Sequence, residues 1–274
     1  MQETVLITGC SSGIGRATAL SFLEEGWTVY ATARNPADIE TLGERGCQLA
    51  TLDVTDGDDV DRVVNRILDE EGRIDCLVNN AGYAQFGPIE DVPVDDARRQ
   101  YEINVHGPHR LCRAVLPHMR REGDGTIVNV SSVAGRLSFP FGGVYSGSKF
   151  ALEAMSDAMR NEVGRHGIDV VVVEPGPVET QFADRADGEI ADLDRTDAYD
   201  SLYALWEDVG LLGGQGPGAV PPGRVAEDVV NAASATKPRA RYPVGPVARG
   251  TLLARFLPDA ARDRLSELLV RFVG

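Results

Sequence analysis

The stretch Thr4-Val5-Leu6-Ile7-Thr8-Gly9-Cys10-Ser11-Ser12-Gly13-Ile14-Gly15 decides the fold of this 274-residue chain. Its first five residues are apolar and β-branched and predict a buried strand, while residues 16–25 have the amphipathic pattern of a helix that ends before Gly26. The glycines between them permit positive φ angles and a close approach of the backbone to a ligand. The N-terminus of such a helix offers unpaired N–H groups and partial positive charge to a pyrophosphate. With a further strand predicted at 28–32, the pattern is typical of a dinucleotide-binding unit.

A second pattern consists of Ser132, Tyr145 and Lys149. Tyr145 and Lys149 stand at i and i+4 of a helix predicted at 144–166, so they share one face and the ammonium can lower the pKa of the phenol. Ser132 follows a strand predicted at 125–131. Tyr-x-x-x-Lys is common by chance and depends on its structural context. In this context, a phenol beside a cation and a hydroxyl indicates a site that reduces a carbonyl group.

Predicted strands and helices alternate along the chain. The strands lie near residues 4–8, 27–32, 48–52, 75–79, 125–131 and 168–174, and the helices near 13–25, 36–44, 57–71, 96–122, 144–166 and 222–235. This alternation predicts an α/β fold, in which a doubly wound parallel sheet with right-handed crossovers lies between two layers of helices. A cofactor would bind across the carboxyl edge of such a sheet.

The spacing Thr-Gly-x-x-x-Gly-x-Gly at residues 8–15 resembles the short-chain dehydrogenase/reductase family. Further motifs of that family recur at Asp53-Val54, Asn79-Asn80-Ala81-Gly82, Asn104, Ser132, Tyr145, Lys149, Pro175-Gly176 and Thr180. The motifs span residues 4–180, about two thirds of the chain. The extended branch of the family, which includes sugar epimerases, has Thr-Gly-x-x-Gly-x-x-Gly instead. The chain therefore resembles the single-domain oxidoreductases, and within them it is similar to steroid and retinol dehydrogenases.

This resemblance implies a Rossmann-type sheet of about seven strands in the order 3-2-1-4-5-6-7, with residues 240–244 as the last strand. It also implies one domain over residues 1–274 and a homodimer or homotetramer formed through the long helices. The catalytic residues it implies are Asn104, Ser132, Tyr145 and Lys149. The expected cofactor contacts are Gly9, Ser11, Ser12, Gly13, Ile14, Gly15, Arg34, Asp53, Val54, Asn80, Ala81, Gly82, Tyr145, Lys149, Pro175, Gly176, Val178 and Thr180.

The implied reaction moves a hydride between a nicotinamide and a carbonyl carbon, while Tyr145 donates or accepts the proton. Lys149 is expected to lower the pKa of Tyr145 and to hold the ribose hydroxyls. Ser132 is expected to hydrogen-bond the substrate oxygen. Asn104 lies inside a predicted helix, where Asn is a poor helix former; we expect it to bend the helix and to hold a water beside Lys149.

Cofactor choice depends on the end of the second predicted strand. An NAD-preferring site has an acidic residue there that accepts hydrogen bonds from the ribose 2′-OH, but this chain has Ala33, followed by Arg34. A guanidinium can hold a 2′-phosphate with paired hydrogen bonds, so we expect NADP(H) to be preferred over NAD(H). The alternative is that Arg34 is an ordinary solvated arginine.

Substrate specificity is expected from the segment 184–220, whose apolar residues recur at helical spacing: Tyr199, Leu202, Tyr203, Leu205, Trp206, Leu211 and Leu212. They predict either a helical flap that closes over a bulky apolar alcohol, ketone or aldehyde, or a face that packs on the body of the protein. The glycines of 213–218 are a candidate hinge. Residues 246–274 predict a C-terminal helical extension that covers the pocket or supports an oligomer.

Composition limits the class of partner. The chain has 42 acidic and 27 basic residues, a net charge of −15, and Lys149 and Lys237 are its two lysines. Such a charge disfavours nucleic-acid binding. It fits either a halophilic-type acidic surface or an arginine-rich composition, which melting in low and molar salt would distinguish. The cysteines and histidines have no metal-ligand spacing, and no apolar run reaches the length of a membrane span, so we expect a cytoplasmic protein without a metal.

Together these patterns predict an NADP(H)-dependent oxidoreductase that acts on a bulky apolar alcohol or carbonyl compound. The alternative is a catalytically silent NADP-binding sensor or scaffold on the same fold. Loss of the Tyr or the Lys would favour that alternative, but both Tyr145 and Lys149 are present.

Overall fold

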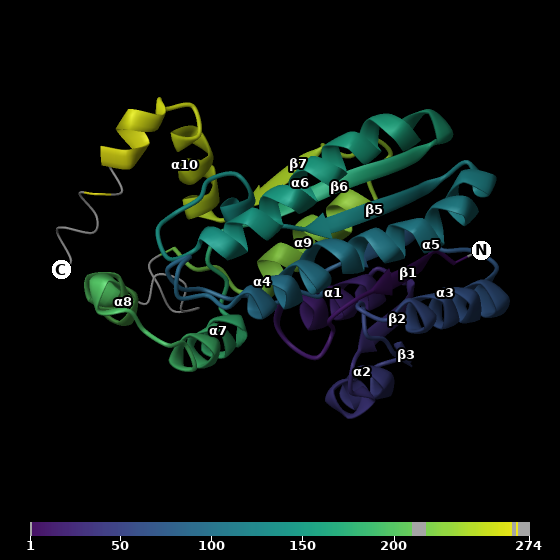
Figure 1. The fold of residues 1–274 in the computed structure, drawn as a ribbon. Helices are drawn as coiled ribbons and strands as arrows, with labels where there is room; N and C mark the ends of the chain where they lie inside the picture. The colour runs from purple at the N-terminus through teal and green to yellow at the C-terminus, as the bar shows by residue number, and fades with distance from the viewer. Residues whose placement is uncertain (1, 210–217, 265–266, 268–274) are drawn as a thin grey trace.

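A parallel sheet of seven strands forms the centre of the computed structural model, which describes residues 2–209, 218–264 and 267 (Figure 1). The strands are β1 (Thr4–Ile7), β2 (Thr28–Ala33), β3 (Gln48–Thr51), β4 (Cys76–Asn79), β5 (Gly125–Val130), β6 (Ile168–Pro175) and β7 (Arg241–Val244). Their order is β3-β2-β1-β4-β5-β6-β7 and all neighbours are parallel. The predicted doubly wound Rossmann-type sheet and its strand order are confirmed.

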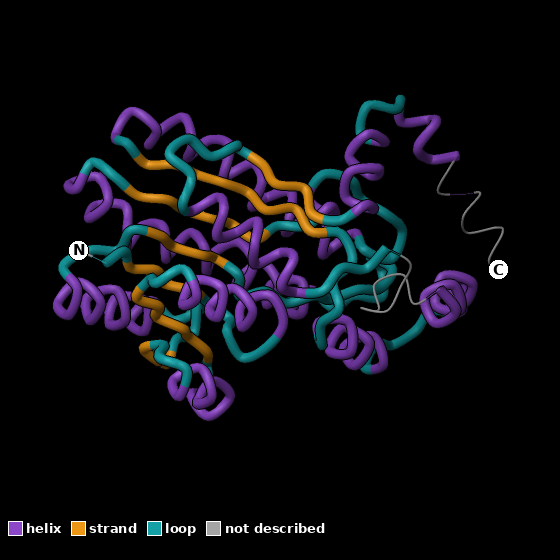
Figure 2. The backbone as a smooth tube through the Cα atoms, turned by 180° about the vertical axis from the view of Figure 1, so that it is seen from behind, coloured by secondary structure: helices purple, strands orange, loops and turns teal. Residues whose placement is uncertain are grey.

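Helices cover both faces of the sheet, so the molecule has three layers (Figure 2). One face carries α1 (Gly13–Glu24), α2 (Glu40–Glu44) and α9 (Pro222–Ala233). The other carries α3 (Gly57–Glu71), α5 (Gly107–Glu122) and α6 (Gly143–Val163). Since both faces are covered, every residue of β1, β4 and β5 is buried, which explains why these strands are mostly apolar and do not alternate with charged residues in the sequence.

The helix predicted at 96–122 is divided into three parts. It consists of α4 (Val94–Tyr101), a π-helical turn η2 (Glu102–His106) and α5. A π turn inserts one residue into the helical repeat and is frequently found at functional sites. The helix predicted at 36–44 likewise begins as a 3₁₀ turn, η1 (Pro36–Ile39), before α2. Two more 3₁₀ turns, η3 (Val133–Gly135) and η4 (Gly164–His166), flank α6.

The segments expected to form a flap and a C-terminal extension lie at the end of the molecule opposite the N-terminus, beyond the carboxyl ends of the strands (Figure 1). They comprise α7 (Phe182–Ala191), η5 (Asp197–Tyr199), α8 (Asp200–Val209) and α10 (Pro246–Ala254). Residues 210–217, which include Leu211, Leu212 and most of the predicted glycine hinge, lie outside the described residues, as do most of 265–274. No helix in the described ranges has the length and apolar character needed to span a membrane.

Candidate active site

The turn between β1 and α1 is built around three glycines. Gly9 and Gly13 have positive φ angles of 72° and 55°, which disfavour any other residue. A Cβ atom on Gly9 would lie 2.8 Å from Cα of Ala81, and one on Gly15 would collide with the carbonyl oxygen of Gly9 and with the side chain of Asn80. The turn is therefore a cradle of bare backbone, packed so closely on Ala81 and Asn80 that it has no room for a side chain at Gly9 or Gly15, and this fits the pyrophosphate of a dinucleotide.

Thr8 and Asn80 fix this turn. The backbone N–H groups of Asn80 and Ala81 both donate to Oγ1 of Thr8, at 3.0 Å each. Nδ2 of Asn80 donates to the carbonyl oxygens of Thr8 (2.9 Å) and Gly9 (3.1 Å). The polar groups of Asn80 and Ala81 thus shape the turn from β4. The sequence analysis named Thr8 as the first residue of the glycine motif but assigned it no role; the structure shows that it holds the turn.

The first turn of α1 has no side-chain cap. Ser12 stands at the N-cap with extended backbone, but its side chain accepts no capping hydrogen bond. The predicted contacts Ser11 and Ile14 lie in the same turn. The first N–H groups of this helix are therefore free of the usual capping oxygen, and they can bind an anion.

The loop after β6 lies against the phosphate turn. A Cβ atom on Gly13 would lie 2.9 Å from Cγ2 of Thr180, and Nη2 of Arg185 donates to Oγ of Ser12 at 3.4 Å. Pro175 ends β6, the N–H of Gly176 donates to the carbonyl oxygen of Val244 at 3.1 Å, and Val178 forms a parallel bridge with Val220. The loop residues expected to contact a nicotinamide thus lie beside those expected to hold its phosphates.

At the end of β2, Ala33 is buried and Arg34 is exposed. The side chain of Arg34 forms no hydrogen bond or ion pair with any other described residue, so its guanidinium can bind a ligand. Asp53, after β3, is engaged locally because its Oδ1 accepts from the N–H and the hydroxyl of Thr55, at 2.9 and 2.8 Å. Val54 is buried against Gly107.

Ser132, Tyr145 and Lys149 meet at the carboxyl end of β5. Ser132 caps η3 and accepts from the N–H of Ala134 at 3.1 Å, and its hydroxyl lies close enough to the Tyr145 phenol to lower the pKa of that phenol. Tyr145 and Lys149 are buried on successive turns of α6. Nζ of Lys149 lies 5.9 Å from the centre of the Tyr145 ring and donates to the carbonyl oxygen of Val130 at 3.0 Å.

Burial dominates the titration of this pair. It raises the pKa of Tyr145 to about 12, against the opposing effect of the Ser132 hydrogen bond. Burial also lowers the pKa of Lys149 to about 8, against the opposing charge of Glu153. The sequence led us to expect that Lys149 lowers the pKa of Tyr145. The structure shows the reverse direction, because the desolvation of the phenolate by burial outweighs the lowering effect of Ser132.

Asn104 lies in the π turn η2 and is fully buried. Its Nδ2 donates to the carbonyl oxygen of Tyr83 (2.8 Å) and to Oγ of Ser148 (3.0 Å), and its Oδ1 accepts from the N–H of Tyr83 (2.9 Å). A Cβ atom on Gly82 would lie 3.7 Å from Oδ1 of Asn104 and 4.0 Å from Nζ of Lys149. The Asn104 amide and the Lys149 ammonium therefore both lie beside Gly82, in the loop after β4.

An aromatic wall adjoins Tyr145. Phe86 lies 5.1 Å from Tyr145 and 4.8 Å from Trp206 between ring centres, and Phe141 lies 4.9 Å from Trp206 and 5.2 Å from Tyr203. The apolar face of α8 therefore packs on the body of the protein, beside Tyr145, while the closing flap stays a prediction. Sequence reasoning missed Phe86 and Phe141; Phe141 has a φ of 74°, a conformation that is rare outside glycine and that often marks a functional site.

Asp91 anchors the segment that leads into α8. Its carboxylate accepts hydrogen bonds from the N–H (3.2 Å) and hydroxyl (2.6 Å) of Thr196 and from the hydroxyl of Tyr203 (2.8 Å). A further bond of 2.7 Å joins the hydroxyl of Tyr199 to Glu90. No signal in the sequence pointed to these contacts. Over the ranges that the structure describes, no group of His, Cys, Asp and Glu has the arrangement of a metal site.

Comparison with known proteins gives a consistent result. A family model for short chain dehydrogenases matches residues 3–190. The chain is 35% identical over 267 residues to the uncharacterized oxidoreductase YbbO of Escherichia coli, with 97% of this chain and 94% of YbbO covered. It is 33% identical over 273 residues to the NADPH-dependent 3-dehydrocapnine reductase of Ornithobacterium rhinotracheale, with 95% and 94% covered.

Among solved structures, a short-chain dehydrogenase from Streptomyces avermitilis is 35% identical, covers 97% of this chain and 96% of its own length, and has a TM-score of 0.81. Sequence motifs, fold and relatives thus agree along most of the chain. The chain belongs to the short-chain dehydrogenase/reductase family of NAD(P)-dependent oxidoreductases.

Proposed function

We propose that this protein transfers a hydride between NADP(H) and a secondary alcohol, ketone or aldehyde whose carbon skeleton is bulky and apolar. The observation that carries the proposal is the position of the buried Tyr145 phenol, which lies beside Ser132 and whose ring centre lies 5.1 Å from that of Phe86 in the aromatic wall. A proton donor, a hydroxyl that can bind the substrate oxygen and an apolar surface thus occur together.

In this proposal the nicotinamide, when bound, supplies or accepts the hydride. Tyr145 gives a proton to the carbonyl oxygen in reduction and takes it back in oxidation, and Ser132 holds that oxygen in place. Lys149 binds the ribose hydroxyls and favours the charged form of the phenol. Asn104, which flanks Gly82 together with Lys149, holds a water that passes protons to solvent.

NADP(H) is proposed because no carboxylate stands at position 33 and the guanidinium of Arg34 is exposed and unpaired among the described residues. The NADPH dependence in the name of the Ornithobacterium rhinotracheale relative supports the same choice. That relative is also named a reductase, which favours carbonyl reduction here.

The apolar substrate is proposed from the wall formed by Phe86, Phe141, Tyr203 and Trp206. The indole N–H of Trp206 already donates to Asp187 at 2.9 Å, so this side chain presents carbon surface to its other neighbours. Trp206→Ala is expected to raise the KM for bulky aromatic ketones by about tenfold, while leaving small aldehydes unaffected. Equal losses for large and small substrates would contradict this assignment.

We further propose that the chain forms one domain and is cytoplasmic. We also propose a homodimer or homotetramer, and sedimentation of the purified chain tests this oligomeric state. The acidic composition, with a net charge of −15, is proposed as an adaptation to high salt. In that case the melting temperature rises steeply between low and molar salt; a flat response would favour the arginine-rich composition as its explanation.

The test of the function is NADPH oxidation with a panel of ketones and aldehydes, in low and molar salt, by wild type and Tyr145→Phe. We expect Tyr145→Phe to lose turnover by about 10²–10⁴-fold and to keep NADPH binding, measured by fluorescence. Tyr30→Phe is the matched control, because it removes a phenol hydroxyl that bonds Glu70 and Glu71, away from the site. If wild type binds NADPH tightly and reduces nothing in either salt, the sensor or scaffold alternative replaces this function.

A further inference from the structure

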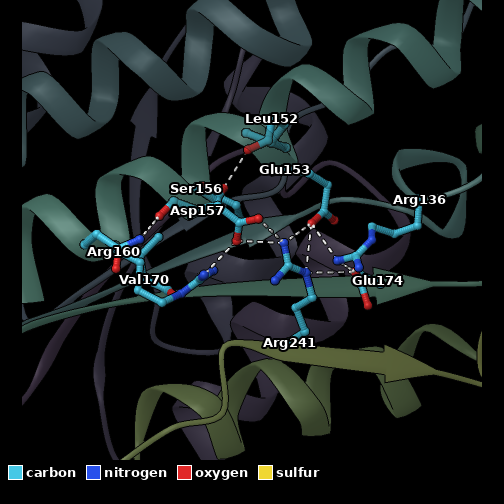
Figure 3. A network of polar contacts seen from close by, with 11 residues as sticks. Arg136, Leu152, Glu153, Ser156, Asp157, Arg160, Val170, Glu174 and Arg241 are labelled. Atoms are coloured by element: carbon cyan, nitrogen blue, oxygen red, sulfur yellow. Dashed lines mark hydrogen bonds and ion pairs between the residues drawn. The ribbon is translucent and has the colours of Figure 1, made fainter. Parts of the chain in front are cut away.

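A square of four charged side chains, two buried carboxylates and two partly exposed guanidinium groups, includes one residue of α6, the helix that carries Tyr145 and Lys149 (Figure 3). Its members are Glu153 of α6, Glu174 of β6, Arg241 of β7 and Arg136, which follows η3. Arg241 lies 3.0 Å from Glu153 and 3.3 Å from Glu174; Arg136 lies 3.7 Å from Glu153 and 3.2 Å from Glu174. Each carboxylate thus contacts both guanidinium groups.

A fifth charged residue, Asp157, lies at the solvent-exposed side of the square. Asp157, one turn after Glu153 on α6, pairs with Arg241 and with Arg160 at 2.7 Å each, and its side chain is 48% exposed (Figure 3). The side chain of Glu153 is only 6% exposed. Solvent screens Asp157, whereas the charge of Glu153 acts through the protein interior.

One oxygen of the Glu153 carboxylate, Oε1, takes no part in the ion pairs of the square. Both of its ion pairs use Oε2, while the buried Oε1 accepts no hydrogen bond from any described residue. A buried carboxylate oxygen without a partner is costly unless a positive charge lies nearby. Lys149 lies one helical turn before Glu153 on the same face of α6.

The 3₁₀ turn η3 packs on α6 at Lys149 and Glu153. A Cβ atom on Gly135 would lie 3.0 Å from Cγ of Glu153 and 3.1 Å from the carbonyl oxygen of Lys149, so the turn packs directly across both residues. The groups that face Lys149 are Tyr145 and Glu153 on its own helix, the Val130 carbonyl at the end of β5, and Gly82 opposite, beside which Asn104 also lies. Among the groups that face it, Glu153 is the one carboxylate. Glu153 itself is faced by Arg136, Arg241 and Glu174.

We propose that Glu153 is a positioning residue which keeps the buried Lys149 ammonium charged, with the two arginines holding the carboxylate in place one turn below it. The inference rests on the proposed function, in which Lys149 acts on Tyr145 and on the cofactor only as a cation. Burial alone drives Lys149 toward its neutral form, and the Glu153 charge opposes this, as the direction of both effects on the Lys149 pKa indicates.

The square also leads us to expect that Glu153 can be replaced by a neutral residue without loss of the fold. Burial and the neighbouring Glu153 raise the pKa of Glu174 to about 7. In Glu153→Gln that neighbour is neutral, so Glu174 ionises more readily and supplies the negative charge that Arg136 and Arg241 require. Glu153→Gln is therefore expected to fold, with the charge moved away from Lys149.

The test uses the two lysines of the chain, Lys149 and Lys237. Lysine labelled with ¹³C at the ε carbon gives two NMR signals, which Lys237→Arg assigns, and a pH titration of the cofactor-free protein reports the Lys149 midpoint directly. We expect a midpoint near 8 in wild type, lower by about one unit or more in Glu153→Gln. Asp157→Asn is the matched control, since it neutralises a carboxylate that also pairs with Arg241 but stands one turn further from Lys149; its midpoint should equal that of wild type.

The alkaline limb of the rate of ketone reduction should move by the same amount as the NMR midpoint. If no ketone is turned over but the Lys149 midpoint still shifts in Glu153→Gln, the proposed function is wrong and the coupling between Glu153 and Lys149 is supported. An unchanged midpoint in Glu153→Gln, or an equal shift in Asp157→Asn, would overturn the coupling. If Glu153→Gln does not fold, the wild-type titration decides: a midpoint below about 7 would mean that Glu153 does not hold the charge.

Discussion

Nδ2 of Asn104 lies 3.0 Å from Oγ of Ser148, the residue before Lys149, and this bond ties the π turn η2 to the helix that carries Tyr145. The same amide group bonds both the N–H and the carbonyl oxygen of Tyr83. One side chain thus connects the loop after β4, the π turn and α6. A residue that joins three segments around a site can affect both stability and geometry.

Asn104→Leu is expected to cost about 1–3 kcal/mol of stability, because Tyr83 and Ser148 lose buried hydrogen-bond partners. Turnover should fall by about 10²-fold through displacement of α6 relative to the loop. Asn161→Leu on the exposed side of α6, where the amide bonds only the carbonyl oxygen of Asp157, should change neither. Thermal melting and steady-state rates on both variants check this; an Asn104→Leu enzyme with full activity would contradict the assigned role.

Gly15→Ala tests the phosphate cradle. The added methyl would collide with the carbonyl oxygen of Gly9 and with Nδ2 of Asn80, so the turn must open and NADPH binding, followed by fluorescence titration, should be lost. Gly57→Ala is the control, because a Cβ atom there meets no atom within 4 Å and the residue begins α3. That variant should bind normally and gain about 0.4–1 kcal/mol of stability. Normal NADPH affinity in Gly15→Ala would exclude the cradle as the binding site.

How much of this site the sequence could predict depends on the range of the contacts. The strands and the Tyr145–Lys149 face followed from periods of two to four residues, which are local properties of the chain. The bonds of Asp91 join it to Thr196, 105 residues later, and nothing in either segment marks the other as its partner. The raised pKa of Tyr145 could not be predicted either, since it depends on burial by several elements at once. From the sequence we expected Asn104 to bend its helix, but the π turn itself could not be predicted, because the three hydrogen bonds of its amide are made with Tyr83 and Ser148 in other segments.

Arg34→Gln tests cofactor choice. Loss of a charged hydrogen bond to the 2′-phosphate, worth about 1.5–3 kcal/mol, should weaken NADPH binding about 10- to 100-fold and leave NADH binding unchanged. Arg45→Gln, which removes another exposed arginine at the end of α2, should affect neither cofactor. Binding of both cofactors, measured by fluorescence without substrate, separates these outcomes. Equal losses for NADPH and NADH in Arg34→Gln would place Arg34 elsewhere on the cofactor.

We expect the ionisation of Glu174 to make the stability of the folded protein depend on pH. Its pKa is raised from an ordinary value of 4.5 to about 7, chiefly by burial and then by the charge of Glu153. A carboxyl whose folded pKa is raised binds its proton more tightly in the folded state. The stability that it contributes is therefore fully present below about pH 4.5 and is lost as the pH rises through about 7.

Glu174→Gln replaces the carboxyl by a permanently neutral group of the same shape. Melting temperatures from pH 5 to about pH 8 should fall more steeply in wild type than in Glu174→Gln, and the difference between the two should grow from pH 5 to about pH 7 and then level off. Glu227→Gln, an exposed acid on α9 that pairs with Arg224, is the control and should follow wild type throughout. Parallel curves for wild type and Glu174→Gln would mean that Glu174 stays ionised in the folded protein. The square would then hold two negative charges at neutral pH, and Glu174 could not take over the charge of Glu153 when that residue is neutralised.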